Sequence, residues 1–428
     1  MFALVDCNNF YVRCERAFDP RLQGRPVLVL SNNDGCDVAR SNEVKALGVK
    51  MGASWFQLKD LARKHGIIAL SSNYTLYGQM SSRVMAVLSD YSPDLEVYSI
   101  DESFLGLDGL AGLWPSFTAL GQHIRQRVLQ WTALPVCVGI APTKTLAKLA
   151  NHIAKKQPVF DGLCDLSALS RREREQLFAE IDVGEVWGVG RRVGARLLAA
   201  GIDNVQALRL APPKWIRAEF GEVMERTVNE LRGIACLALE DIAPAKKEMV
   251  VSRSFGQMVE TFDELAESVT QYASRAAEKL REQQSIAGVV QVFVMTNRFR
   301  EADAQYSNAI AVPLIAPSSD TRVLTQAALL GLQRIFRSGY RYKKAGVMLM
   351  ALSPSKYFQG SLFDAPGDAI DLAQSTRIMQ ALDTINDRFG RASLFLGSAG
   401  VSTRWTARSD NRSPRYTTQW DELPRTNN

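Results

Sequence analysis

Residues 249 to 352 repeat one pattern, and this pattern restricts the possible fold more than any other feature of the chain. An alternating apolar segment precedes a stretch with apolar residues every three or four positions, and another alternating segment follows. A period of two indicates a strand, and a period near 3.6 indicates a helix. The order strand, helix, strand, strand, helix, strand (βαββαβ) predicts two helices packed on one face of a four-stranded sheet. We expect strands at 249–255, 287–297, 306–314 and 342–352, and helices at 263–284 and 319–336.

The first 165 residues also mix strands with helices, so the chain as a whole is expected to be an α+β protein. Short apolar segments at 1–7, 26–30 and 135–140 predict buried strands, and a helical period runs over 74–88. The segment 95–105 predicts a hairpin with two adjacent carboxylates at its turn.

With 428 residues the chain is too long for one hydrophobic core, because domains usually hold roughly 100–200 residues. The composition changes near residue 165, and an irregular charged stretch around Pro244 suits a linker. After Pro354 the content of Gly, Pro, Ser and Asp rises. We therefore expect a mixed domain at 1–165, a helical domain at 166–235, a linker at 236–248, the βαββαβ domain at 249–352 and a partly ordered tail at 353–428.

The overall composition excludes several classes of protein. Hydrophobic residues make up 46% and charged residues 22%, which excludes a disordered chain and a coiled-coil rod. No apolar run approaches the roughly 18 residues of a membrane span, so we expect neither insertion nor secretion. Six scattered cysteines and three histidines argue against a zinc site and for buried thiols in a reducing cytosol. The net charge of +6 favours a polyanionic partner.

Three carboxylates stand where apolar strands are predicted to end: Asp6, Asp101 and Glu102. A charged group in such a place needs a partner, and a cation is one such partner. Carboxylates with substrate phosphates suit Mg²⁺, and two ions about 3.5–4 Å apart could share Asp6 and Asp101. The alternative is a set of turn acids paired with lysine or arginine.

Basic residues near these acids form a second group that could bind a triphosphate. The alternative is a solvated helix face. Tyr11, which follows Phe10, could place its ring against the sugar of a nucleotide, with core packing as the alternative. The basic candidates are Arg40, Lys45, Lys50, Lys144, Lys148, Lys155 and Lys156, with Lys155 and Lys156 preferred.

Two further regions could contact nucleic acid. Gly188 and Gly190 punctuate two helical stretches, and a G-x-G turn presents backbone N–H groups to a phosphate. The alternative is a plain pair of helices, although Arg191, Arg192 and Arg196 favour DNA. Basic residues on the βαββαβ strands could line a groove on the face that its helices leave open: Arg253, Arg298, Arg300, Arg341, Lys343 and Lys344.

A short motif follows the last predicted strand. Gln359 precedes Leu362 and Phe363, and an extended segment of this kind can fill a shallow apolar pocket on a partner. Chance occurrence is the alternative for so short a motif.

Seven spaced segments carry a family resemblance. Residues 6–11 (DCNNFY), 99–103 (SIDES) and 139–150 (GIAPTKTLAKLA) resemble the signature motifs of the Y-family, translesion DNA polymerases. Residues 31–36 (SNNDGC), 45–52 (KALGVKMG), 71–74 (SSNY) and 413–418 (SPRYTT) resemble one bacterial branch of that family. The motifs follow the family's order over nearly the whole chain.

The resemblance implies a right-hand polymerase, with palm and small fingers in 1–165 (fingers about 20–75), a thumb with a helix-hairpin-helix in 166–235 and a little finger in 249–352. It places Asp6, Asp101 and Glu102 on the catalytic carboxylates, which bind two Mg²⁺ ions with help from the Cys7 carbonyl. It makes Tyr11 a steric gate against the ribose 2′-OH. The implied nucleotide-binding residues are Phe10, Tyr11, Asn42, Lys45 and Lys155, although many relatives carry Tyr and Arg in place of Asn42 and Lys45. The DNA-binding candidates are Gly188, Gly190, Arg191, Arg192, Arg253, Arg298, Arg341 and Lys343.

The implied activity is error-prone addition of dNTPs to a primer 3′-OH past damaged bases in the SOS response. The resemblance also implies three partners: the UmuD′ dimer and RecA at the tail, and a sliding clamp at Gln359, Leu362 and Phe363. Two other functions remain possible from the residues alone. A nuclease could use the same carboxylates, and a catalytically weak scaffold of the same complex could bind primed DNA without extending it.

Overall fold

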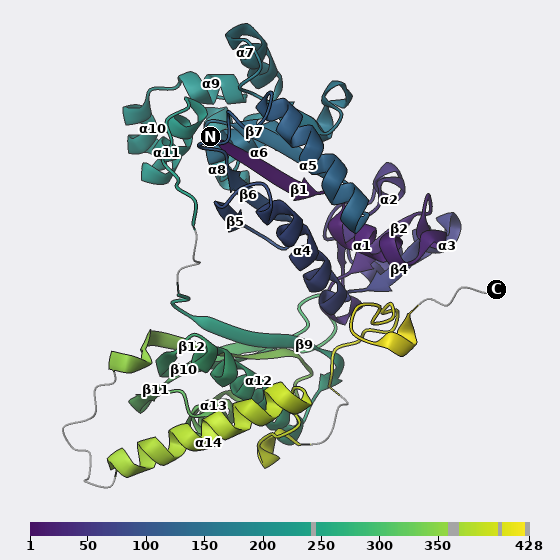
Figure 1. The fold of residues 1–428 in the computed structure, drawn as a ribbon. Helices are drawn as coiled ribbons and strands as arrows, with labels where there is room; N and C mark the ends of the chain where they lie inside the picture. The colour runs from purple at the N-terminus through teal and green to yellow at the C-terminus, as the bar shows by residue number, and fades with distance from the viewer. Residues whose placement is uncertain (241–244, 358–367, 401–404, 424–428) are drawn as a thin grey trace. The chain divides into compact units, whose positions relative to one another are not determined.

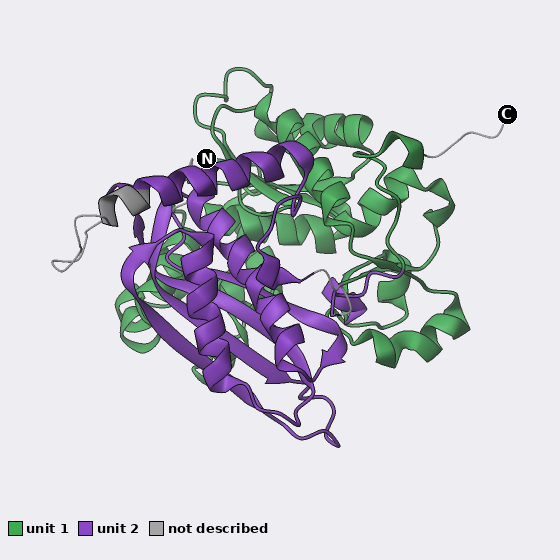
Figure 2. Ribbon diagram, turned by 90° about the horizontal axis from the view of Figure 1, so that it is seen from below, with its two compact units in different colours: residues 1–30, 36–243, 411–428 green, residues 31–35, 244–410 purple. Residues whose placement is uncertain are grey.

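The computed structural model describes residues 1–240, 245–357, 368–400 and 405–423. In helix α14 (Asp368–Phe389) it describes the side chains from residue 373 onward. The chain forms two compact units. The first contains residues 1–30, 36–243 and 411–428, and the second contains residues 31–35 and 244–410 (Figure 2). Among the described residues, no helix combines the length and the apolar character needed to cross a membrane.

The first unit is built on a five-stranded sheet in the order β5-β6-β1-β7-β8 (Figure 1). Alternate residues of its central strand β1 point to opposite faces, as the strand period requires. Ala3 and Val5 pack with α4 and α5, whereas Leu4 packs with α6. The strands are β1 (Phe2–Cys7), β5 (Leu95–Val97), β6 (Glu102–Gly106), β7 (Val136–Ala141) and β8 (Leu163–Asp165), and the helices are α1 (Phe10–Phe18), α4 (Tyr74–Ser89), α5 (Phe117–Thr132) and α6 (Lys144–Lys156). The hairpin predicted at 95–105 is confirmed by the antiparallel pairing of β5 with β6.

A small three-stranded sheet lies in the same unit, in the order β3-β2-β4. Leu28 and Leu30 of its central strand are fully buried against Val44 and Ala62 of the neighbouring helices. Its elements are β2 (Val27–Leu30), β3 (Asp37–Arg40), β4 (Ile68–Ser71), α2 (Asn42–Ala46) and α3 (Trp55–His65).

Five helices follow β8 and share the apolar core of α6. They are α7 (Arg171–Glu180), α8 (Arg191–Ala199), α9 (Val205–Leu210), α10 (Pro213–Phe220) and α11 (Glu222–Leu231). The pair of helical stretches predicted around Gly188 and Gly190 is only half correct. The second is α8, but the first is reduced to a single 3₁₀ turn, η4 (Val183–Glu185).

The second unit confirms the βαββαβ prediction. Its antiparallel sheet has the order β11-β10-β12-β9, and α12 and α13 pack on one face through residues such as Leu265, Val269 and Leu324. The elements are β9 (Met249–Val259), α12 (Phe262–Glu282), β10 (Ser285–Thr296), β11 (Ser307–Ser318), α13 (Thr321–Ile335) and β12 (Tyr342–Pro354).

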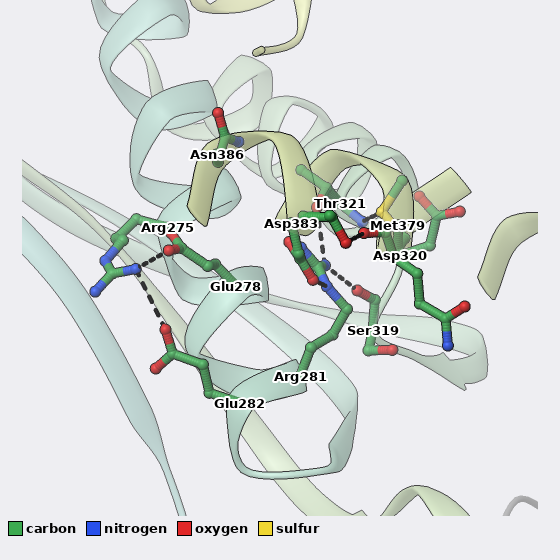
Figure 3. A network of polar contacts seen from close by, with 12 residues as sticks. Arg275, Glu278, Arg281, Glu282, Ser319, Asp320, Thr321, Met379, Asp383 and Asn386 are labelled. Carbon is green, nitrogen blue, oxygen red and sulfur yellow. Dashed lines mark hydrogen bonds and ion pairs between the residues drawn. The ribbon is translucent and has the colours of Figure 1, made fainter. Parts of the chain in front are cut away.

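The stretch expected to be a partly ordered tail contains a long helix, α14 (Asp368–Phe389). Arg281 of α12 binds the Asp383 carboxylate with two nitrogens at 2.6 and 2.7 Å, and Met379 is buried beside the N-terminus of α13 (Figure 3). Trp405 packs edge-to-face on Phe255 and Tyr272. Sequence periodicity missed the helix because these anchors are mainly polar and few of its side chains are buried.

Gly139 sets how closely α6 approaches the five-stranded sheet. A Cβ atom at this position of β7 would overlap the backbone nitrogen of Asn151 and the carbonyl oxygen of Ala147. We expect Gly139→Ala to lower the free energy of unfolding by about 3 kcal/mol or more, because the whole helix would have to move. Urea denaturation measures the effect. Gly112→Ala is the control, since a Cβ there meets nothing within 4 Å; equal stability of the two variants would contradict the prediction.

Candidate active site at the acidic end of the five-stranded sheet

The three predicted carboxylates lie at one end of the five-stranded sheet. Strands β1 and β6 run antiparallel, and their register places Asp6 directly opposite Glu102. The Cys7 backbone N–H donates to the Asp101 carbonyl at 2.9 Å, which fixes the turn before β6 against the end of β1. The last residue pair of the β1–β6 ladder therefore brings two acids face to face, with the third beside them.

Asp6 and Glu102 affect each other's protonation. Burial raises the pKa of Asp6 to about 7, against the opposing charge of Lys155, and the neighbouring Glu102 adds to the rise. Burial also favours the neutral form of Glu102, but a hydrogen bond with Asp6 and the charge of Lys148 together lower its pKa. Such crowding of two carboxylates favours a bound cation, because a divalent ion would stabilise both in their ionised forms.

Each of the three acids is bound by a neighbouring side chain, through an ion pair or a hydrogen bond. Lys155 Nζ lies 2.5 Å from Asp6 Oδ2, and Lys148 Nζ lies 2.7 Å from Glu102 Oε2. The Ser99 hydroxyl donates to Asp101 Oδ1 at 2.7 Å. Throughout the described ranges, no three carboxylate, imidazole or thiol groups approach closely enough to form a ligand set. The oxygen donors suit Mg²⁺ in type and charge, but they are arranged here as ion pairs.

One polar stripe of α6 supplies these lysines. Lys144, Lys148, Asn151 and Lys155 follow at intervals of four, three and four residues, so they share the helix face that meets the sheet. Asn151 donates to the Cys137 carbonyl at 2.9 Å. Lys144 is buried and binds both oxygens of Glu96 at 2.7 and 2.8 Å. Lys144 is therefore neither a solvated residue nor one free to meet an anion.

Asn9 forms hydrogen bonds with both Asn42 and Lys45, the two residues that were expected near the triphosphate. Its Nδ2 donates to Asn42 Oδ1 at 2.9 Å, and its Oδ1 accepts from Lys45 Nζ at 2.5 Å. Asn9 adopts a left-handed backbone (φ 49°) at the start of α1, a conformation that asparagine tolerates better than most residues. This role of Asn9 was not predicted from the sequence, although its place between the DC and FY of residues 6–11 was a possible signal.

Lys45 lies among other cations. Burial lowers the pKa of its ammonium, and the charges of Arg40, Lys155 and Lys156 lower it further. Arg40 is paired with Asp37, but the remaining positive charge favours an anion at this place.

Tyr11 belongs to a group of aromatic rings beside the acids. Its ring stacks on Tyr77 with centroids 4.3 Å apart and planes 15° apart, and meets Tyr74 edge-on at 6.1 Å. Phe10 is buried in the core, whereas Tyr11 is half-buried. Tyr11 thus packs against the core on one side, as the alternative held, and keeps an exposed side that could meet a nucleotide.

The G-x-G turn lies at the N-terminus of α8. Gly188 has a φ of 89°, Gly190 caps the helix, and Arg191 and Arg192 are exposed in its first turn. Two arginines at the positive end of a helix dipole are unfavourable unless an anion is close. The arrangement favours phosphate binding.

The basic residues of the second unit do not share one face. Arg253 pairs in register with Ala345, a buried core residue, so it lies on the face that the helices cover. The prediction that Arg253 lines the open face is wrong. The sequence shows that residues of β9 alternate between two faces, but the register of β9 against β12 is needed to tell which face Arg253 is on. Arg298 lies over the ring of Phe299, Arg341 pairs with Glu260 and Asp303, and Lys343 donates to the Phe255 carbonyl at 2.5 Å. Gln359, Leu362 and Phe363 lie outside the described residues.

Comparison with known proteins decides the family. Residues 5–152 match the model of the impB/mucB/samB family, and residues 246–362 match its C-terminal domain. The chain is 46% identical to Protein UmuC of Salmonella typhimurium over 99% of its length and 100% of that protein. The chain belongs to the impB/mucB/samB family. Within this family it is also 44% identical to Protein MucB of Escherichia coli, over 99% of both chains.

A more distant relative and a solved structure are similar to most of the chain, and a further family model matches residues 376–425. The chain is 26% identical to DNA polymerase IV of Dehalococcoides mccartyi over 92% of its length and 96% of that protein. A Y-family DNA polymerase chimera, Dbh-Dpo4(243-245)-Dbh, superposes with a TM-score of 0.63 at 21% identity, covering 82% of this chain and 99% of that chain. The polymerase fold that the sequence predicts is thereby confirmed, and the identity to Protein UmuC confirms the resemblance to that bacterial branch. Residues 376–425 match a domain of unknown function (DUF4113).

Proposed function

We propose that the acidic end of the five-stranded sheet is the catalytic centre of an error-prone translesion DNA polymerase. The enzyme is a DNA-directed DNA polymerase that adds dNTPs to a primer 3′-OH opposite damaged template bases. The observation that carries this proposal is the cross-strand pair of Asp6 and Glu102, with Asp101 beside them, in a chain of this family.

In this proposal the carboxylates of Asp6, Asp101 and Glu102, with the Cys7 carbonyl, hold two Mg²⁺ ions. When bound, such ions lower the pKa of the primer hydroxyl and neutralise charge on the reacting phosphate. Before the ions bind, Lys155 and Lys148 keep the acids ordered through their ion pairs, and ions at Asp6 would free Lys155 for the triphosphate. The primer 3′-hydroxyl loses its proton to solvent, and its oxygen forms a bond to the α-phosphorus as the bond to pyrophosphate breaks in line.

The nucleotide is held by residues around this centre. Lys45, tied to Asn42 through Asn9, and Lys155 meet the triphosphate, for which the surplus positive charge is suited. Phe10 supports α1 from the core, and the half-buried Tyr11 faces the sugar, where its ring excludes a 2′-OH. The gate consequently selects deoxyribonucleotides.

DNA is bound through its backbone. The Gly188 and Gly190 turn with Arg191 and Arg192 takes one phosphate region, since N–H groups and guanidinium groups converge there. Arg298, Arg341 and Lys343 supply further phosphate contacts, and a phosphate would compete with Glu260 and Asp303 for Arg341.

The enzyme works in the cytoplasm with three partners: the UmuD′ dimer, activated RecA, and a sliding clamp that takes Gln359, Leu362 and Phe363. The identity to a protein named UmuC supports the first two. The motif itself supports the third.

Primer extension tests the proposal. Wild-type protein, primed template with or without one abasic site, and dNTPs are combined in Mg²⁺ or in EDTA, with and without UmuD′ and activated RecA. We expect Mg²⁺-dependent extension that copies the template and passes the abasic site more often with the partners present. Release of nucleotides from the primer would indicate a nuclease. Retention of DNA without extension under every condition would indicate the catalytically weak scaffold.

A further inference from the structure

The C-terminal segment 411–416 lies against α1 and α4 of the first unit. The Ser71 backbone N–H donates to the Asn411 carbonyl at 2.9 Å, and the Asn411 N–H donates to Ser71 Oγ at 3.0 Å. The ring of Tyr416 stacks on Phe18, with centroids 5.0 Å apart and planes 5° apart. This segment belongs to the domain of unknown function, and both of its ends are thus fixed to the same unit as the candidate active site.

Ser413, at the middle of the segment, connects two buried polar residues. Its hydroxyl accepts from Asn73 Nδ2 at 2.9 Å and donates to Glu15 Oε1 at 3.0 Å. Asn73 also caps α4, because its Oδ1 accepts from the Leu76 N–H at 3.3 Å. Since a hydroxyl has one proton and Asn73 is a donor here, that proton goes to Glu15.

Glu15 depends on this hydroxyl. Its side chain is 1% exposed, and the same Oε1 accepts from the Tyr77 hydroxyl at 2.7 Å. Within the described part of the chain it takes part in no ion pair, so hydroxyl donors compensate for its burial. The pKa of Glu15 is raised, chiefly by burial, and the hydrogen bonds from Tyr77 and Ser413 reduce that rise. Loss of one donor from a buried carboxylate costs more than loss of an exposed hydrogen bond.

Glu15 and Tyr77 lead to the sugar-facing residue. Tyr11 and Glu15 are one helical turn apart on α1 and share a face. The buried ring of Tyr77 stacks on Tyr11 while its hydroxyl is held by Glu15. The Tyr77 ring, and through it Tyr11, is therefore connected to Ser413 by way of the Glu15 carboxylate, which accepts from both hydroxyls.

We propose that Ser413 is a positioning residue for Tyr11, so that the C-terminal segment helps to set the preference of the enzyme for deoxyribonucleotides. The proposal rests on the proposed function of Tyr11 as the residue facing the sugar. It gives part of the domain of unknown function a role in substrate selection.

The test measures single-nucleotide insertion by the full chain on undamaged primed DNA. The readout is the ratio of kcat/KM for a dNTP to that for the matching rNTP. We expect Ser413→Ala to lower this ratio by roughly 10-fold, the factor that one hydrogen bond represents. Tyr77→Phe, which keeps the stacked ring, should lower it similarly, whereas Ser413→Thr should retain the wild-type ratio. Ser409→Ala, at an exposed serine of the same region, is the matched control.

A double variant separates positioning from general destabilisation. In a Tyr11→Ala background, Ser413→Ala should lower the ratio no further, because the two residues act through one ring. A wild-type ratio in folded Ser413→Ala, or additive losses in the double variant, would overturn the inference while leaving the gate intact. If Tyr11→Ala alone leaves the ratio unchanged, the proposed role of Tyr11 fails and the inference fails with it.

Discussion

Replacing Asp101 with asparagine is expected to reduce primer extension by about 10³-fold, the equivalent of about 4 kcal/mol of transition-state stabilisation. The side chain keeps its size and can still accept the hydrogen bond from Ser99, so the fold should be retained. What is lost is one negative charge beside Asp6 and Glu102, where the proposed chemistry needs a cation. Single-turnover extension with saturating dNTP and Mg²⁺ gives the rate.

The Asp101 variant has a matched control. Asp90→Asn removes a charge from an exposed aspartate at the end of α4, and it should extend primers at the wild-type rate. Unfolding curves of both variants should coincide with that of the wild type. If Asp101→Asn extends primers as fast as Asp90→Asn, Asp101 has no part in catalysis.

Replacing Tyr11 with alanine is expected to lower the discrimination against ribonucleotides by roughly 10²-fold, because the ring that would clash with a 2′-OH is gone. Incorporation of dNTPs should change far less than incorporation of rNTPs. Tyr11→Phe keeps the ring that stacks on Tyr77, and it should discriminate as the wild type does. The measurement compares kcat/KM for paired dNTP and rNTP substrates.

An unchanged sugar preference in Tyr11→Ala would show that another residue faces the 2′ position. A parallel loss of dNTP and rNTP insertion would instead indicate that removing the ring disturbs α1 as a whole.

The sequence predicted the βαββαβ unit well because both of its periods are strong and its turns are short. It also placed Asp6 and Glu102 at strand ends, where local pattern alone is informative. It could not predict that Arg253 faces the helices, because the register of β9 against β12 depends on contacts between distant strands. Helix α14 was missed for a related reason. Its partners Arg281 and Thr321 lie far from it in the sequence, and its own pattern is weak.

In the candidate site, too, local motifs were predictable from the sequence, whereas contacts between distant segments were not. Tyr11, Lys45 and Lys155 could be selected by motif, but the bridging role of Asn9 required the fold of α1 against α2. The connection from Ser413 to Glu15 spans nearly the whole chain, and no local pattern in either segment points to the other.

The same connection has a consequence for synthesis of the protein. Glu15 and Ser413 are 398 positions apart, and at about 5–20 residues per second the ribosome needs roughly 20 to 80 s to cover that distance. During this interval α1 and α4 exist without the segment that donates to the Glu15 carboxylate and stacks on Phe18. A chain released from the ribosome before residue 411 would lack segment 411–416, which packs beside the region of Tyr11. Only a chain translated beyond Tyr416 contains all of these contacts beside Tyr11.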